Sequence, residues 1–164
     1  MIFVTVGTHE QPFDRLLKCI DKMVTDGKIK EEVIVQKGYT DFELKYCEEY
    51  KLIGYDEIQK YIQEARIVIT HGGPASFIAP LSIGKIPIVV PRKKEYNEHV
   101  NNHQLDFAKQ VEKRMKNIIV AEDEEELEDA IINYDDKIKK LNSNMISNNK
   151  KFIERLNESI AEII

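Results

Sequence analysis

IVITHGGPASFIAPLSIGKIPIVVP, residues 67–91, is the stretch of sequence that decides the fold. Its first four residues are apolar or β-branched, which is typical of a strand buried on both faces of a parallel sheet. A glycine turn at 71–73 comes next, and Pro74 then stands where proline favours the first turn of a helix. A helix is predicted up to the next glycine, followed by a second buried strand at 86–90. The stretch therefore predicts one strand–helix–strand unit.

The turn between this strand and this helix, His71-Gly72-Gly73, has the composition of an anion-binding site. Glycines leave backbone N–H groups bare, and the first turn of a helix is the positive end of its dipole. Ser76, inside that turn, adds a hydroxyl group. Similar glycines also occur where a strand packs tightly on a helix without any ligand. The turn therefore predicts phosphate binding and leaves simple packing as the alternative.

The composition is that of a soluble protein with one hydrophobic core. The chain has 164 residues, of which 42% are hydrophobic and 32% charged, and we expect a single domain over residues 1–164. No apolar run is long enough to cross a membrane and the amino end does not resemble a signal peptide, so we expect a cytoplasmic protein. The net charge of −5, with no basic face, argues against nucleic acid as a partner. Cys19 and Cys47 have neither metal-ligand nor redox spacing.

Strands alternate with helices along the chain, which predicts an α/β fold with a Rossmann-like, doubly wound parallel sheet. Further strands are predicted at 2–6, 32–36 and 117–121, and further helices at 12–26, 56–65, 99–113 and 124–134. Asp56 and Asp123 stand at the start of two of these helices, and we expect each to be an N-cap. Residues 39–54 are ambiguous, with short strands suggested at 44–47 and 50–53.

Residues 135–164 form a predicted C-terminal tail with helical periodicity. Its apolar residues are spaced mostly three or four apart, at positions 138, 141, 145, 152, 156, 160 and 163. Two asparagines, at 148 and 149, weaken the middle of this pattern. We expect an amphipathic helix that packs back on the domain, with binding to a partner as the alternative.

Three polar segments follow predicted strands: Gly7–Gln11, His71–Ser76 and Arg92–Gln104. In a doubly wound sheet the ligand lies beyond the carboxyl ends of the strands, where the strand order reverses. We therefore expect these segments to meet at one edge of the sheet. The first of them also fits a plain helix cap, with Thr8 and His9 next to the following helix.

Other chemistries agree less well with the sequence. His99 and His103 have a spacing that can hold zinc on one helix face, but no third ligand is evident, although His9 and His71 are expected at the same edge. Ser76 lies within a predicted helix and not on the strand–helix elbow that exposes a hydrolase nucleophile. The Gly-x-Gly-x-x-Gly spacing of dinucleotide sites is missing from both glycine turns. We therefore expect neither a metal nor a bound cofactor.

Four motifs in a fixed order carry a resemblance to a known family: VGTHEQPF at 6–13, THGGPAS at 70–76, GKIPIVVPR at 84–92 and EHVNNHQ at 98–104. With them the chain resembles the C-terminal, donor-binding half of GT-B glycosyltransferases, least so in its tail. Within that group it is similar to free-standing catalytic subunits of two-component enzymes. One branch is the eukaryotic subunit that adds the second N-acetylglucosamine to dolichol-linked sugar. The bacterial capsule and exopolysaccharide subunit resembles the chain more closely.

The resemblance implies a site for a UDP-sugar donor. Backbone and hydroxyl groups at the glycine turns would hold the diphosphate and stabilise the UDP leaving group without a metal: Gly7, Thr8, Gly72, Gly73 and Ser76. His71 matches the family histidine at the turn. Arg92 would add positive charge near the phosphates, unless it is a plain surface arginine. The segment that in relatives reaches the donor sugar contains His99, Asn102, His103 and Gln104.

One departure from the family pattern concerns the nucleoside. Many relatives carry a glutamate three residues after the serine, where it binds the ribose hydroxyls, and here that position is Ala79. The bacterial capsule branch often lacks this glutamate as well. The ribose contact is therefore expected from another residue.

The resemblance also implies a division of labour between two proteins. The acceptor-binding half would be a separate, membrane-anchored partner subunit, and the acceptor an undecaprenyl-diphosphate-linked saccharide. We expect that partner to hold the chain at the inner face of the plasma membrane. The expected reaction transfers galactose with inversion to form a β-1,4 link, and glucose and N-acetylglucosamine are the other donor sugars considered. His9 and Glu10 are the candidates for the general base on this chain, unless the partner supplies it. A homodimer is left open.

Two other functions remain as alternatives. The first is a regulatory module that binds a nucleotide-sugar without turnover. The second is a small, self-sufficient hydrolase or phosphate-transfer enzyme.

Overall fold

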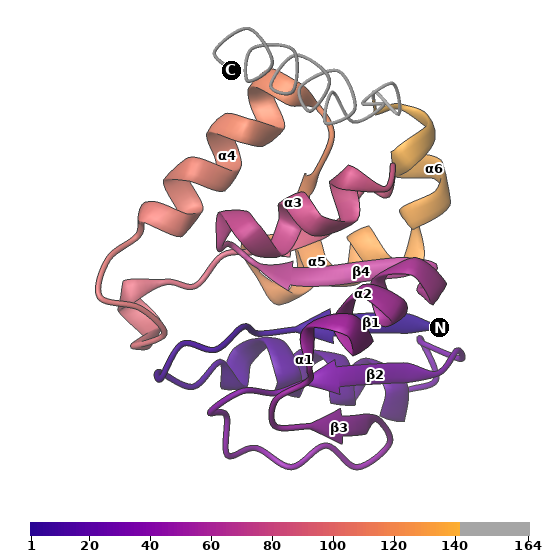
Figure 1. Cartoon of the computed structure of the whole chain (residues 1–164), viewed down its shortest axis with the longest axis vertical. Coiled ribbons are helices and arrows are strands. Elements are labelled where there is room, and N and C mark those ends of the chain that lie inside the picture. The colour runs from indigo at the N-terminus through magenta and orange to yellow at the C-terminus, as the bar shows by residue number, and fades with distance from the viewer. Residues whose placement is uncertain (142–164) are drawn as a thin grey trace, which may run out of the picture.

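A parallel sheet of six strands forms the centre of the protein, as seen in a computed structural model that describes residues 1–141 (Figure 1). The strands are β1 (Ile2–Thr5), β2 (Val33–Gln36), β3 (Glu48–Tyr50), β4 (Ile67–His71), β5 (Ile88–Val90) and β6 (Ile119–Val120). They lie in the order β3-β2-β1-β4-β5-β6, and every neighbouring pair is parallel. The order reverses between β1 and β4, which is the doubly wound arrangement. The predicted fold class is confirmed.

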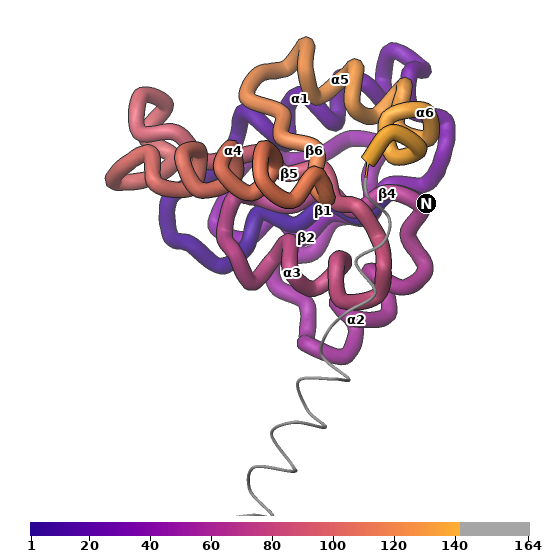
Figure 2. Tube along the Cα trace, turned by 90° about the horizontal axis from the view of Figure 1, so that it is seen from above, coloured from indigo at the N-terminus to yellow at the C-terminus, as the bar shows by residue number. Residues whose placement is uncertain are grey.

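Helices cover both faces of the sheet, so that the molecule has three layers (Figure 2). The helices are α1 (Asp14–Thr25), α2 (Tyr55–Glu64), α3 (Pro74–Ser82), α4 (His103–Met115), α5 (Glu124–Ile132) and α6 (Tyr134–Lys139), and a 3-10 turn spans Lys94–Tyr96. One face packs against α1, α5 and α6, and the other against α2, α3 and α4. Among the described helices, none is long and apolar enough to span a membrane.

The central strand β1 shows why the sequence forms this sheet. Its side chains alternate between the two faces, so that Val4 belongs to the core under α1 and α5, while Phe3 belongs to the core under α2. Val4 lies in register with Val35 on one side and with Ile69 on the other. All four residues of β1 are buried, which explains why its sequence is a continuous apolar run and not an alternating one.

Three local predictions need correction. The third strand lies at Glu48–Tyr50, not at 44–47 or 50–53, and it pairs with β2 at the edge of the sheet. Helix α2 begins at Tyr55 after Gly54, so that Asp56 lies in its first turn and caps nothing. The fourth helix begins at His103 and not at residue 99, because the chain from 97 to 102 forms an irregular loop.

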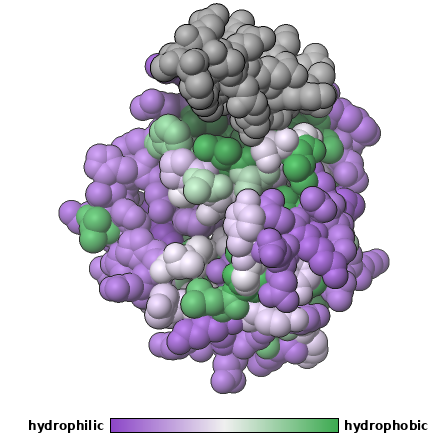
Figure 3. Space-filling model, viewed as in Figure 1, coloured by the Kyte–Doolittle hydropathy of each residue, from purple (hydrophilic) through white to green (hydrophobic). Residues whose placement is uncertain are grey.

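The surface over α2, α3 and α4 is mixed, with apolar side chains set among polar ones (Figure 3). The exposed apolar residues of these helices include Tyr55, Ile78 and Phe107. The predicted amphipathic tail begins within the structure, because α6 covers Tyr134–Lys139. The rest of it, from residue 142 on, lies outside the described residues.

Candidate functional site

The first two predicted turns lie side by side at the reversal of strand order. Gly7 follows β1 and the turn His71-Gly72-Gly73 follows β4, and these two strands are neighbours in the sheet. Gly7 has a φ of +77°, a left-handed conformation that favours glycine, and its N–H donates to Thr5 Oγ1 at 3.2 Å.

The imidazole of His71 lies between these two turns and explains both glycines. A Cβ atom at Gly7 would lie 2.5 Å from His71 Cε1, and one at Gly73 would lie 2.5 Å from His71 Nε2. Both distances are far shorter than any van der Waals contact. The hydroxyl of Ser76, one turn into α3, lies 3.5 Å from His71 Nε2. Gly7 and Gly73 are therefore needed to make room for the His71 ring, which is a different contact from the strand–helix packing considered as the alternative to phosphate binding.

The third polar segment packs directly on the second. A Cβ atom at Gly72 would lie 2.8 Å from Gln104 Cβ and 3.2 Å from Pro91 Cα, so only glycine fits there. Gln104 Oε1 in turn accepts a hydrogen bond from the Arg92 N–H at 3.2 Å. This contact joins the start of α4 to the end of β5.

The third segment also touches the first. The rings of His9 and His99 lie 4.8 Å apart between centroids, and Gln11 Nε2 donates to the Asn97 carbonyl at 3.1 Å. The three segments, which are remote in sequence, therefore meet at the carboxyl edge of the sheet. The predicted convergence is confirmed.

Two cavities of about 430 Å³ each flank the start of α3. The α2–α3 cavity lies toward β2, and its lining combines the glycine turns with polar residues of α2 and β2: Thr5, Gly7, Thr8, Gln36, Tyr55, Ile58, Gln59, Ile62, His71, Gly73, Pro74, Ala75, Ser76 and Ala79. The α3–α4 cavity lies on the other side of Pro74 and is lined by Gly72, Pro74, His103, Gln104, Asp106, Phe107 and Gln110. An elongated ligand that crosses the amino end of α3 would occupy both.

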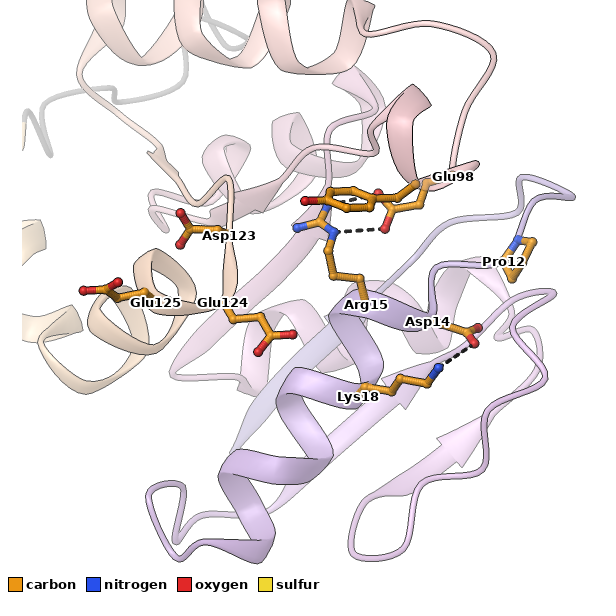
Figure 4. Close-up of a pocket in the computed structure, with 9 residues that line it drawn as sticks. Pro12, Asp14, Arg15, Lys18, Glu98, Asp123, Glu124 and Glu125 are labelled. Atoms are coloured by element: carbon orange, nitrogen blue, oxygen red, sulfur yellow. Dashed lines mark hydrogen bonds and ion pairs between the residues drawn. The ribbon is translucent and has the colours of Figure 1, made fainter.

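A larger cavity, of about 700 Å³, lies toward α1 and α5 (Figure 4). Its lining is mostly acidic: Pro12, Asp14, Arg15, Lys18, Tyr96, Glu98, Asp123, Glu124 and Glu125. Arg15 is paired with Glu98, and Lys18 with Asp14, so neither cation is free to hold an anion. This cavity therefore suits a phosphate poorly, because its unpaired groups are carboxylates.

His71 is held in its neutral form. Burial lowers its pKa from 6.5 to about 4, and the charge of Arg92 acts in the same direction. At neutral pH the ring is therefore a neutral hydrogen-bonding group next to Ser76, not a cation. It can orient the serine hydroxyl but adds no net charge for an anion.

His9 and Glu10, the predicted base candidates, lie at the rim of the site and line neither flanking cavity. His9 is half-buried, and burial followed by the charge of Arg92 lowers its pKa. Its Nδ1 accepts a hydrogen bond from the Gln11 N–H at 3.1 Å, so the neutral ring carries its proton on Nε2. Glu10 is exposed and forms no salt bridge within residues 1–141.

Among the predicted site residues, Arg92 differs most from the prediction, because it is fully buried. It is neither a surface arginine nor a group that can touch a ligand, because none of its surface is exposed. Its guanidinium donates to main-chain carbonyls of the surrounding loops. Its positive charge lies behind the site, where it acts on the histidines and not on a phosphate directly.

The residues of the predicted sugar-binding segment have two different roles: Asn102 makes hydrogen bonds within the loop, whereas His103 and Gln104 line the α3–α4 cavity. The amide group of Asn102 is occupied within the loop, accepting from the Lys94 N–H at 2.8 Å and donating to Glu95 at 3.1 Å. His99 lies in the loop beside His9, and His103 begins α4, so the zinc spacing does not place them on one helix face. Among residues 1–141, no group of three or more His, Cys, Asp or Glu could hold a metal ion.

Several residues of the two cavities are missing from the sequence-based prediction, among them Gln36, Tyr55 and Gln59. Gln36 could have been found, because it ends β2 at the same carboxyl edge as Gly7. Tyr55 and Gln59 lie in the first half of α2 and carry no recognisable motif. Only the packing of α2 beside α3 brings them to the cavity.

Comparison with known proteins shows which family the chain belongs to. The chain matches the glycosyltransferase family 28 C-terminal domain over residues 1–160. It is 36% identical over 121 residues to a UDP-N-acetylglucosamine transferase subunit, ALG13, of Homo sapiens, and 30% identical over 125 residues to ALG13 of Mus musculus. Each match covers 68% of this chain but 10% of the relative, so the chain spans about a tenth of the length of these curated relatives.

Solved structures show the same fold at low sequence identity. The glycosyltransferase SnogD from Streptomyces nogalater has a TM-score of 0.51 and 16% identity, covering 85% of this chain and 39% of that one. The glycotransferase of kitacinnamycin has a TM-score of 0.53 and 14% identity, covering 80% of this chain and 34% of that one. These likenesses show the shared fold, and the match over residues 1–160 shows that the chain belongs to the glycosyltransferase family 28 C-terminal domain family, a GT-B half-domain.

Proposed function

We propose that the chain is the catalytic subunit of an inverting UDP-sugar glycosyltransferase that works with a separate acceptor-binding subunit. The observation that carries this proposal is the pair of cavities on either side of the amino end of α3, with three loops gathered around it. A nucleotide-sugar has the matching shape, because its diphosphate separates a nucleoside from a sugar.

The diphosphate is proposed to lie at the start of α3. Gly73, Ala75 and Ser76 line the α2–α3 cavity there, and the positive end of the helix dipole favours an anion. The Ser76 hydroxyl is part of the same lining and is half-buried, so it can donate to a phosphate oxygen. These donors would stabilise the leaving UDP as its charge develops, which a transferase needs whether or not a metal takes part.

The nucleoside is proposed to occupy the α2–α3 cavity beyond the diphosphate. Ala79 lines this cavity and leaves space where many relatives have a glutamate, and Gln59 lines the same cavity from α2. The side-chain amide of Gln59 makes no hydrogen bond to any residue of the described part of the chain, so it is available to ribose hydroxyls. Tyr55 is 76% exposed at the mouth, where its ring can stack on a base.

The donor sugar is proposed to enter the α3–α4 cavity, where His103, Gln104 and Asp106 supply polar groups for hydroxyls. Galactose follows from the resemblance to bacterial capsule subunits, whereas the names of the curated relatives refer to UDP-N-acetylglucosamine. Thermal shifts of the purified chain with UDP-galactose, UDP-glucose and UDP-N-acetylglucosamine would rank the donors. A donor present at about 100 times its dissociation constant raises the stability by roughly 2.7 kcal/mol.

The proposed reaction is a single displacement with inversion. An acceptor hydroxyl attacks the anomeric carbon of the donor, the bond from that carbon to the diphosphate oxygen breaks, and UDP leaves with the electron pair. The acceptor proton goes to a general base, for which His9 and Glu10 are the candidates on this chain. His9 must give up its contact with Gln11 or change its tautomer to accept that proton, because Nε2 carries the proton in the structure.

The acceptor is proposed to be a lipid-linked saccharide, undecaprenyl-diphosphate-linked in bacterial surface polysaccharide synthesis, presented by a membrane-anchored partner. The curated relatives are named as transferase subunits, which supports a partner. A partner of this kind would bring the chain to the inner face of the plasma membrane.

The decisive experiment combines the purified chain, membranes that contain the partner, and radiolabelled UDP-sugars. A lipid-linked labelled product that requires both the chain and the membranes is expected, with and without a metal chelator. If no UDP-sugar gives such a product, the proposed activity is wrong.

A second function, a nucleotide-sugar-binding module without turnover, is favoured by one observation: neither base candidate lines a cavity. The variant His9→Ala separates the two functions. A transferase that uses His9 loses rate while donor affinity changes little, whereas a binding module keeps its affinity and has no rate to lose. Release of UMP or phosphate by the chain alone would instead indicate a self-sufficient hydrolase.

A further inference from the structure

Arg92 is an arginine with no exposed surface, placed directly after β5 at the carboxyl edge of the sheet. Its guanidinium lies 4.7 Å from the centroid of the Phe13 ring. Buried arginines are rare, because removing the charge from water costs several kcal/mol unless other groups compensate. The contacts that compensate at Arg92 therefore show what the residue does.

These contacts are main-chain carbonyls of two separate loops. Nη2 donates to the Val6 carbonyl at 2.9 Å. Nη1 donates to the carbonyls of Gln11 at 2.7 Å, Glu98 at 3.1 Å and Pro12 at 3.4 Å. Val6 and Gln11 bracket the first turn, which carries His9, and Glu98 precedes His99 in the third segment. One guanidinium thus holds both loops.

The side-chain carboxylate of Glu98 does not contact the Arg92 guanidinium but binds a second arginine, Arg15, nearer the surface. It accepts from Arg15 Nε at 2.9 Å and Nη2 at 3.0 Å, as Figure 4 shows, and from the Lys93 N–H at 3.0 Å. Arg15 also donates to the carbonyls of Pro91 and Glu122. The two arginines therefore have different roles: Arg92 contacts both the loop of His9 and the loop of His99, whereas Arg15 contacts the outer side of the His99 loop.

We propose that Arg92 is a positioning residue, whose buried guanidinium holds the turn of His9 against the loop of His99 in the geometry that sugar transfer requires. It does so without touching the donor. Lysine cannot replace it, because a single ammonium group cannot reach carbonyls that lie in different directions from a planar fork.

The charge of Arg92 has a second effect at the same place. It lowers the pKa of His9 and of His71, after burial, which is the larger cause in both cases. The other charged or titratable groups that act on His9 are His99, in the same direction, and Glu10, in the opposite one. Both His9 and His99 act on His71. Arg92 therefore favours neutral imidazoles where a base or a hydrogen-bonding group is needed.

A first test uses the unaltered chain and no donor. Hindered rotation of a guanidinium held by four carbonyls separates the NMR signals of its Nη protons, whereas an exposed arginine gives averaged signals. We expect separate signals for Arg92 and a cross-relaxation peak between the ring protons of His9 and His99. Averaged Arg92 signals would overturn the proposal even if every variant failed to fold.

A second test compares Arg92→Lys and Arg92→Gln with Arg66→Gln. Arg66 is the control, because it likewise joins separate segments, here through the carboxylates of Glu31 and Asp135, but lies before β4 at the opposite edge of the sheet. Both Arg92 variants are expected to lose the peak between the two rings, and Arg92→Gln alone to raise the titration midpoints of His9 and His71. If folded Arg92 variants keep the peak and the midpoints, Arg92 contributes to the stability of the fold but does not position the two loops.

The kinetic test rests on the proposed function. For Arg92→Lys we expect kcat to fall at least about tenfold with the KM for the donor within about threefold, as misplacement of reacting groups predicts. For Arg92→Gln the acidic limb of the kcat/KM profile should also move to higher pH, because His9 then protonates more easily. A folded Arg92→Lys variant with wild-type kcat would contradict the proposal about Arg92. If the unaltered chain transfers no sugar at all, the proposed function is wrong, and the NMR tests alone decide whether Arg92 positions the two loops.

Discussion

His71 is the residue on which the packing of the site depends. It occupies the space that side chains at Gly7 and Gly73 would fill, and the hydroxyl of Ser76 lies next to it. The glycine-turn motif therefore has a packing requirement that holds whether or not a phosphate is bound. A motif residue that looks like a ligand contact in the sequence can be needed for a neighbouring side chain.

Gly7→Ala should destabilise the protein more than Gly84→Ala does. Both glycines have a left-handed φ, +77° and +80°, but nothing lies within 4 Å of a Cβ at Gly84. The shared backbone cost is about 1–2 kcal/mol. Displacement of His71 adds about 1–3 kcal/mol at Gly7. Urea unfolding would measure the difference, and equal losses for the two variants would show that His71 moves aside freely.

The pKa of His71 predicts a loss of stability in acid. Because the pKa falls from 6.5 to about 4 on folding, the unfolded chain binds the proton more readily, so stability is complete above pH 6.5 and falls as the pH drops toward 4. The loss is at most about 3 kcal/mol. Urea unfolding at several pH values should show a weaker pH dependence for His71→Gln than for the wild type or for His103→Gln, which alters an exposed histidine. The same dependence in all three proteins would contradict the assignment.

At the scale of elements, the two predicted helix caps had different outcomes. Asp123 caps α5, since its Oδ1 accepts from the Glu126 N–H at 2.8 Å. Asp56 does not cap α2, because Gly54 takes that position and the helix begins one residue before the aspartate. The sequence alone did not separate the two cases, since each aspartate precedes an amphipathic helix.

Asp123→Ala should therefore cost about 1 kcal/mol of stability, while Asp56→Ala should change it by less than about 0.5 kcal/mol. The first substitution removes a cap hydrogen bond, and the second removes an exposed charge from the first turn of a helix. Thermal unfolding of both variants would compare them directly. A larger effect at Asp56 would mean that α2 begins where the sequence pattern placed it.

At the scale of the whole molecule, the strand order produces the site. The order reverses between β1 and β4, so the helices that follow these strands cover opposite faces and leave space above the sheet edge. The loop after β5 then closes that space from one side, with Arg92 and Gln104 as its contacts. Helix α2 closes it from the other side.

Binding of UDP should protect distant segments of the chain together. Hydrogen exchange is expected to slow in residues 7–11, 71–76 and 55–59, all of which line or adjoin the α2–α3 cavity. Residues 27–32, at the opposite edge, serve as the internal control and should not change. Protection confined to one of the three segments would contradict a shared site.

Much of the fold could be predicted because buried parallel strands have a distinctive sequence. Runs such as IFVT in β1 and IVITH in β4 are apolar on both faces and are followed closely by glycine. Their strand structure and their order along the chain can therefore be predicted from the sequence. The exposed edge strand β3, with the sequence EEY, has no such pattern and was placed wrongly. Its pairing with β2 determines it, and pairing is not a local property.

By itself, the sequence determined the α/β class, the glycine turns after two strands and the expectation that three polar segments would meet. These features follow from local periodicity, and the rule that parallel strands end at a common edge extends them to the site. Only the tertiary structure decided that Arg92 is buried behind the site, that His71 fills the space between two glycines, and that Gln59 and Ala79 line one cavity. The physical reason is that burial and contact depend on segments far apart in the chain, which no local pattern records.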